Sequence, residues 1–304
     1  MININVTNEI SQLQSVIVGI ANDFGGIPDI KDCYDPKSKE HVISGHYPKE
    51  VDLVNEIENF CTLLEKYNIK VYRPDNILGL NQIFSRDIAF VIEDKLVLPN
   101  IISNRQKEAD AIKGLVSMID DENIIRTSSN VRIEGGDVIL CNDFIFVGYS
   151  EEQDFEQYTV ARTNKSGVDF LISNFPAKVV KGFELNKSDL DAKENALHLD
   201  CCFQPIGKKS AILYRAGFKR TEDVEFIINY FGKDNIIEIT KDEMYHMCSN
   251  IFSISESVLV SEKGFIRLNN ELRKRGFIVE EIPYAETAKM EGLLRCSTMP
   301  LIRE

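Results

Sequence analysis

Short apolar runs separated by polar turns recur along the chain. Residues 87–92 and 95–98, for example, flank a two-residue acidic turn, which predicts a β-hairpin. A segment with helical spacing of apolar residues follows at 105–118, and a third apolar run follows at 123–126. The pattern therefore predicts a unit of strand, strand, helix and strand.

Similar units are expected elsewhere in the chain, so the motif is used roughly five times. Three are built on the hairpins 131–140 with 144–147, 196–203 with 211–214, and 249–254 with 258–260. A further unit has strands at 15–19 and 69–73 around a helix at 50–67. Repeats that cannot bury an apolar face alone must pack around a common axis.

Two segments interrupt this rhythm. Residues 27–48 are polar and contain three prolines, which indicates a long surface loop over a cleft, and residues 151–195 are expected to form a polar excursion. In the helix at 50–67 the apolar stripe is expected to consist of Val51, Val54, Ile57, Cys61 and Leu64. No change of composition marks a domain boundary, so residues 1–304 are expected to form one domain.

Composition narrows the class of protein. Hydrophobic residues make up 43% of the chain and charged residues 27%, as in ordinary globular proteins. No apolar run is long enough for a membrane span, and the first ten residues lack the pattern of a signal peptide, so a cytoplasmic location is expected. The net charge of −13 argues against binding to nucleic acid or anionic membranes and suits a small cationic partner. A homo-oligomer is left open.

Cysteine and histidine spacing gives no sign of a bound metal. The seven cysteines are scattered without a CxxC pair, and the four histidines show no HExxH spacing. We therefore expect neither a disulfide framework nor a zinc site, and no cofactor. The C-terminal stretch 289–304 is apolar, so it should be tied down inside the fold, where Cys296 is either a core cysteine or a thiol placed for chemistry.

Four polar clusters lie at the start of the predicted hairpins. They are residues 81–87, 134–137, 198–200 and 295–296. Each has an ordinary structural explanation: a local ion pair of Arg86 with Asp87, a glycine turn, a core histidine and a core cysteine. His198 and Asp200 alternate, so they are expected on one face of a strand. Taken together, the clusters combine a thiol, an imidazole and several carboxylates, which suits a planar cation with several N–H donors better than a metal.

The motifs Phe84-Ser-Arg-Asp87, Glu134-Gly-Gly-Asp137, His198-Leu-Asp200 and Arg295-Cys-Ser-Thr-Met-Pro-Leu301 resemble those of the guanidino-group-modifying superfamily. Its members include arginine deiminases, arginine dihydrolases, dimethylarginine hydrolases and amidinotransferases. The resemblance runs in the family's order over residues 81–304. It implies an α/β fold, a five-bladed α/β-propeller (pentein) with pseudo-fivefold repeats, and a small guanidino substrate.

The resemblance also implies roles for individual residues. Cys296 matches the nucleophile and His198 the general acid and base. Asp87 and Asp200 match the carboxylates that hold the guanidinium, and Glu134 matches the acid that orients the histidine. Further candidate binding or supporting residues are Asn81, Phe84, Arg86, Asp137, Arg295 and Asn22.

The chain also departs from the deiminase pattern. The sequence Glu291-Gly-Leu-Leu294 replaces a Gly-Gly pair, and the arginine usual after the EGGD hairpin is missing at 150–153. Arg215 is a candidate replacement for binding the substrate carboxylate, although a solvated arginine in a turn explains it equally. The expected activity is hydrolysis of the guanidino group of L-arginine or a close analogue through a thiouronium intermediate. Transfer of the amidino group to an amine and non-catalytic binding remain alternatives.

Overall fold

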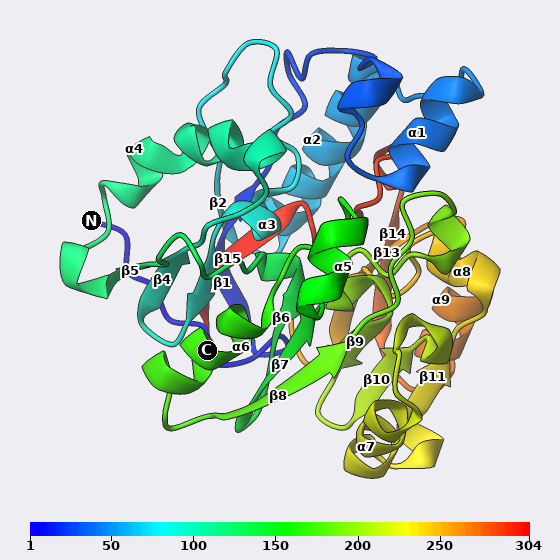
Figure 1. Ribbon diagram of the computed structural model, residues 1–304. Helices are drawn as coiled ribbons and strands as arrows, with labels where there is room; N and C mark the ends of the chain where they lie inside the picture. Colours follow the sequence, from blue (N-terminus) through cyan, green and yellow to red (C-terminus); the bar gives the residue numbers. More distant parts are fainter.

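The computed structural model describes residues 1–304 and contains five three-stranded sheets with one connectivity (Figure 1). In each sheet the middle strand pairs antiparallel with one neighbour and parallel with the other. The strands, sheet by sheet, are β15 (Thr298–Arg303), β1 (Leu13–Val18) and β2 (Lys70–Tyr72); β3 (Phe90–Ile92), β4 (Lys95–Leu98) and β5 (Ile124–Arg126); β6 (Val138–Cys141), β7 (Phe144–Tyr149) and β8 (Val179–Glu184); β9 (Phe203–Ile206), β10 (Ser210–Leu213) and β11 (Ile236–Glu238); β12 (Phe252–Ser253), β13 (Val258–Glu262) and β14 (Ile278–Ile282).

Helical segments connect the two parallel strands of every sheet. The helices are α1 (Pro36–Ile43), α2 (Glu50–Lys66), α3 (Ser85–Ile88), α4 (Lys113–Val116), α5 (Glu152–Gln157), α6 (Lys165–Asn174), α7 (Thr221–Phe231), α8 (Lys241–Tyr245), α9 (Ile266–Lys274) and α10 (Ala285–Ala288). The predicted strand–strand–helix–strand repeat is therefore confirmed at the level of connectivity. A mixed α/β fold results.

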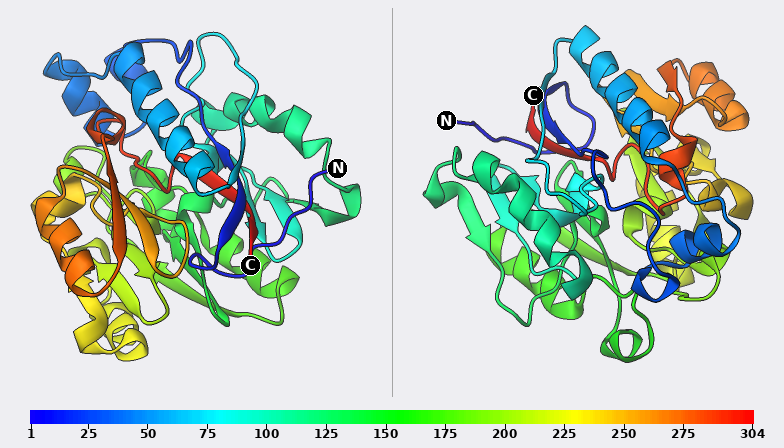
Figure 2. Two further views of the ribbon diagram at one scale, coloured as in Figure 1. Left: turned by 180° about the vertical axis from the view of Figure 1, so that it is seen from behind. Right: turned by 90° about the horizontal axis from the view of Figure 1, so that it is seen from above.

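The two ends of the chain meet in one sheet. β15, red in Figures 1 and 2, pairs antiparallel with β1, and Val16 lies opposite Pro300. Leu293, Leu294 and Leu301 are fully buried, which confirms that the C-terminal stretch is tied down. This pairing fixes the segment that carries Cys296, because β15 begins only two residues after it.

Several predicted elements differ from the structure. The stretch expected as loop at 27–48 contains the 3₁₀ helix η1 (Ile30–Asp32) and α1, where Asp35 caps the helix by accepting the N–H of Ser38. The expected helix at 105–118 is mostly the 3₁₀ helix η2 (Ser103–Ile112). The expected excursion at 151–195 instead contains α5, α6 and β8, which form the regular crossover of the third sheet. The polar composition of residues 27–48 and 151–195 gave no indication of the helices and the strand that they form.

Helix α2 shows how the core is formed. Leu53, Ile57, Phe60 and Leu64 are completely buried, and the Phe60 ring packs edge-to-face against Tyr284. These residues follow helical spacing, but the stripe is rotated from the predicted one, since Val51 is exposed. No helix in the structure has the length and apolar character needed to cross a membrane.

Candidate active site

In four of the five sheets, the candidate residues lie just before the strand that pairs antiparallel with the middle strand. Asp87 lies in α3 before β3, and Glu134 precedes the 3₁₀ turn η4 (Gly135–Asp137) before β6. His198 and Asp200 flank and enter the 3₁₀ turn η6 (Leu199–Cys201) before β9, and Cys296 precedes β15. The prediction that His198 and Asp200 share one face of a strand is wrong, because the chain turns here and β9 begins only at Phe203.

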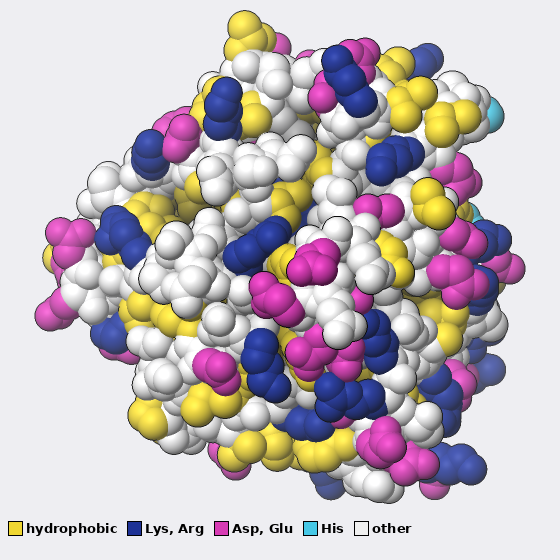
Figure 3. Space-filling view, in the orientation of Figure 1, with side chains coloured by type: hydrophobic (Ala, Val, Ile, Leu, Met, Phe, Trp, Pro, Cys, Tyr) yellow, Lys and Arg dark blue, Asp and Glu magenta, His cyan; other side chains and the backbone are white.

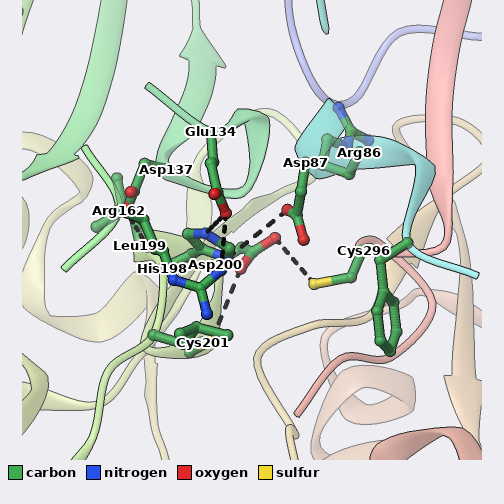
Figure 4. A network of polar contacts seen from close by, with 12 residues as sticks. Arg86, Asp87, Glu134, Asp137, Arg162, His198, Leu199, Asp200, Cys201 and Cys296 are labelled. Carbon is green, nitrogen blue, oxygen red and sulfur yellow. Dashed lines mark hydrogen bonds and ion pairs between the residues drawn. The ribbon is translucent and has the colours of Figure 1, made fainter. Parts of the chain in front are cut away.

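The thiol of Cys296 lies beside a carboxylate (Figure 4). Its Sγ is 3.5 Å from Oδ2 of Asp200, and Nη1 of Arg295 is 2.8 Å from the same oxygen. Burial, and then the carboxylates of Asp200 and Asp87, raise the pKa of the Cys296 thiol well above its usual value. The thiol is therefore protonated at neutral pH.

His198 is held between two acids. Its Nε2 lies 2.9 Å from Oε2 of Glu134, and its Nδ1 lies 3.6 Å from Oδ1 of Asp87. Burial by itself lowers the pKa of His198, but Asp87 and Glu134 outweigh it and raise the pKa above the ordinary value. His198 thus favours the imidazolium form, which can donate a proton.

The Gly-Gly pair of the EGGD motif allows these groups to meet. A Cβ atom on Gly135 would lie 2.1 Å from the carbonyl oxygen of Arg86, and one on Gly136 would lie 2.6 Å from Nδ1 of His198. Asp137 has a positioning role, because its Oδ1 accepts the N–H of Leu199, next to His198. Glycine is required here by close approach.

Two buried arginines that were not predicted also enter the cluster. Arg105, from η2, pairs with Asp87 at 2.7 Å and with Glu108 at 2.7 Å. Arg162, from the crossover between β7 and β8, pairs with Glu134 at 3.1 Å. The arginine usual after the EGGD hairpin is missing at 150–153, as the sequence indicates, but Arg162, later in the same segment, reaches Glu134.

A second buried network lies behind Cys296 and was also missed. Arg295 pairs with Glu9 at 2.9 Å in addition to Asp200. Arg86 lies 3.9 Å from Glu9, and its backbone N–H donates to the carbonyl of Cys296 at 3.0 Å. The suggested ion pair of Arg86 with Asp87 is therefore wrong, and Arg86 supports the cysteine turn. Burial and the neighbouring Arg295 lower the pKa of Arg86 to about 9.

The remaining predicted residues lie in different places. Phe84 packs its ring over Gly292, where an added Cβ would lie 2.3 Å from the ring. Asn81 lines a cavity of about 170 Å³ that also contains Tyr34 and Met290. Arg215 is exposed and pairs with Glu238 at 2.9 Å, so the structure does not bring it to the cluster.

Asn22 is exposed as well, and no hydrogen bond joins it to the other candidates. On the face shown in Figure 3, Lys and Arg side chains are interspersed with Asp and Glu. The net negative charge therefore does not form a single acidic field on this face.

The acids that could hold a metal ion are already paired within the protein. Ligand atoms of Asp87, Glu134 and His198 lie within 4.8 Å of one another. Both carboxylates, however, already pair with the guanidinium groups of Arg105 and Arg162. The donor set is thus occupied by planar cations of the protein itself.

Comparison with known proteins identifies the family to which this chain belongs. A family model described as "N,N dimethylarginine dimethylhydrolase, eukaryotic" matches residues 49–303. The uncharacterized protein YkgA of Bacillus subtilis (strain 168) is 32% identical over 243 residues, which cover 79% of this chain and 77% of YkgA.

Two solved structures are similar in fold. The N-terminal domain of ArgZ, an arginine dihydrolase from Cyanobacteria, has a TM-score of 0.77 at 16% identity, covering 95% of this chain and 98% of that domain. The inosamine-phosphate amidinotransferase StrB1 from Streptomyces griseus has a TM-score of 0.76 at 13% identity, covering 100% and 97%. Because the family model spans most of the chain, this protein belongs to the N,N dimethylarginine dimethylhydrolase family, within the guanidino-modifying pentein superfamily.

Proposed function

We propose that this protein hydrolyses the guanidino group of L-arginine or a close analogue through a covalent intermediate on Cys296. The observation that carries the proposal is the convergence of a thiol, an imidazole and three carboxylates from four sheets in one buried cluster. The five equivalent sheets and the pairing of β15 with β1 support a single five-bladed propeller over residues 1–304, with this cluster at its centre.

An unpartnered carboxylate oxygen supports a guanidinium as the ligand. Oδ1 of Asp87 is buried without a hydrogen-bond partner. Leaving a buried polar atom unpaired costs about 1–3 kcal/mol, so a ligand that supplies N–H donors is favoured. A bound cation also stabilises the Cys296 thiolate, so the substrate itself activates the nucleophile, and a low thiol pKa in the empty site would contradict this.

The first half of the reaction forms a C–S bond. The Cys296 thiolate attacks the central guanidinium carbon, the imidazolium of His198 gives its proton to the departing nitrogen, and the C–N bond breaks. An S-alkylthiouronium remains on Cys296, and His198 is neutral. Asp87 and Asp200 hold the planar cation during attack, and Glu134 keeps the imidazole oriented.

The second half releases the product. Neutral His198 takes one proton from a water molecule whose oxygen attacks the thiouronium carbon, the C–S bond breaks, and the thiolate and imidazolium return. The other proton of the water passes to the solvent, where the ammonia or amine released in the first half becomes an ammonium ion, so the balance closes. Arg105 and Arg162, buried beside Tyr34 at 5.9 and 5.5 Å from its ring, are the candidates to meet an anionic end of the substrate.

Substrate access requires movement of the segment 30–43. Cys296 is 2% exposed and His198 is completely buried. The segment is fastened over the cluster, because Nη2 of Arg162 donates to the carbonyl of Tyr34 at 3.0 Å and Nζ of Lys37 donates to the carbonyl of Tyr245. Displacement of this segment would open the cavity lined by Tyr34 and Asn81.

Amidino transfer is the second candidate, supported by the likeness to StrB1 over the full chain. Product analysis separates the candidates: purified protein is incubated with L-arginine, with N-methylated arginines, and with arginine plus an amine acceptor. Citrulline indicates simple hydrolysis, ornithine with ammonia indicates dihydrolysis, and ornithine formed only with the acceptor indicates transfer. A Cys296→Ser variant is the control. Absence of any product would favour a non-catalytic binder and overturn the proposal.

A further inference from the structure

The fifth sheet also supplies a residue to the cluster, and it is an asparagine. Asn250 lies two residues before β12, just as Cys296 lies two residues before β15. It is completely buried. Four sheets contribute the thiol, the imidazole and the acids from this structural position, so Asn250 occupies the equivalent place in the remaining repeat.

The amide of Asn250 contacts the sulfur directly. Its Nδ2 lies 3.1 Å from Sγ of Cys296. Its Oδ1 accepts two backbone N–H groups, from Cys296 at 3.1 Å and from Leu293 at 3.2 Å. Two donors facing one end of the amide require that end to be the oxygen, so the NH₂ group must face the sulfur.

The surroundings of the sulfur give this contact its importance. Asp200 lies 3.5 Å away and disfavours a negative charge on the sulfur. Arg295, although adjacent in sequence, directs its guanidinium to Asp200, Glu9 and the carbonyl of Val138. Of the two side chains that contact the sulfur, Asp200 is an acceptor and Asn250 is the donor.

We propose that Asn250 is a catalytic residue that donates a hydrogen bond from Nδ2 to the thiolate of Cys296 and fixes its direction. This inference rests on the proposed function. A purely structural role is the competing explanation, in which Asn250 only accepts the N–H groups of Leu293 and Cys296. The two explanations differ in whether the Nδ2–H donor is needed.

Asn250→Asp separates them, because aspartate has the same shape and accepts both N–H groups. Those two bonds favour the ionised carboxylate, which cannot donate to the sulfur. Alkylation of Cys296 by iodoacetamide at pH 9 is followed by mass spectrometry of the Cys296 peptide, without substrate. Loss of a hydrogen bond to the charged sulfur should lower the fraction of thiolate by about 10- to 100-fold. A thiolate with a higher pKa is also a stronger nucleophile, which offsets part of that loss, so alkylation should slow by about tenfold.

The matched control is Asn269→Asp, the same change at a buried amide in α9, where Nδ2 donates to the carbonyl of Glu262. It should lower stability and leave Cys296 alkylation unchanged. In turnover assays Asn250→Asp should lower kcat with little change in KM. If Asn250→Asp does not fold, Asn250→Ser, which adds no charge, is measured in the same way and should also slow alkylation.

Wild-type alkylation and turnover in a folded Asn250 variant would overturn the inference and leave the proposed function intact. The alkylation test needs no substrate, so slow alkylation in Asn250→Asp would support the hydrogen bond even if the wild-type protein turned over no guanidino compound. Failure of the proposed function would instead appear as absence of product from the wild-type protein.

Discussion

Gly136→Ala tests whether the close approach of the EGGD turn sets the positions of His198 and Asp87. The added methyl carbon would lie 2.6 Å from Nδ1 and 2.7 Å from Cγ of His198, and 2.8 Å from Oδ1 of Asp87. Neither neighbour can yield freely, since His198 is hydrogen-bonded to Glu134 and Asp87 is paired with Arg105. The substitution therefore acts on both groups at once.

The size of the effect follows from these distances. To reach 3.4 Å, the lower end of ordinary contact, the imidazole must retreat by 0.8 Å from 2.6 Å. Misplacement of a reacting group by about 1 Å costs on the order of 100-fold in rate, so kcat/KM should fall by about that factor. Overpacking of this kind should also lower the free energy of unfolding by about 1–3 kcal/mol.

The assay compares kcat/KM of wild-type protein, Gly136→Ala and a control, Gly114→Ala, on whichever guanidino compound the wild type uses. Gly114 is exposed, and a Cβ there would meet only the end of the Asp75 side chain at 3.2 Å. The control should retain full activity. A folded Gly136→Ala protein with wild-type kcat/KM would refute the reasoning that His198 and Asp87 are positioned against this glycine.

Four further predictions concern individual side chains. Cys296→Ser and His198→Ala should each lower kcat by about 10³-fold or more, measured as product formation, and near-normal rates would remove the role assigned to that residue. Glu9→Gln leaves buried arginines without their partner and should cost about 3–5 kcal/mol in urea unfolding; an unchanged midpoint would contradict this. Burial alone would raise the pKa of Glu9, but the arginines lower it to about 2 from 4.5, so its contribution to stability should be complete above pH 4.5 and disappear as the pH falls through 2. Arg215→Ala should leave KM nearly unchanged, because Arg215 pairs with Glu238 at the surface; a large rise in KM would restore its proposed part in substrate binding.

The repeat was visible in the sequence because alternation and hairpin turns are local. The predictions of secondary structure that proved wrong lie where tertiary contacts override the preference of the local sequence. The alternating stretch Leu197-His198-Leu199-Asp200 has the spacing of a strand, yet it folds into a turn whose backbone is held by Asp137. Residues 151–174, expected as a polar excursion, supply the helices of a crossover because Val168 and Leu171 of α6 pack into a buried core that the polar composition did not indicate.

The site was predictable as far as its residues lie in contiguous motifs. Glu9 and Arg295 are 286 residues apart, and nothing in either local sequence indicates the pairing. Arg105 and Arg162 likewise reach the acids only through the crossovers of the second and third sheets. Asn250 could have been found by applying the fivefold repeat to the start of the hairpin at 249–254.

The most direct test of the central claim is product formation from L-arginine and N-methylated arginines by the wild-type protein and by Cys296→Ser, measured side by side. We expect a ureido or amine product from at least one compound with the wild type and none above background with the variant. Equal turnover by the variant, or no product from the wild type with any compound, would contradict the assignment of Cys296 as the nucleophile of a guanidino-modifying enzyme.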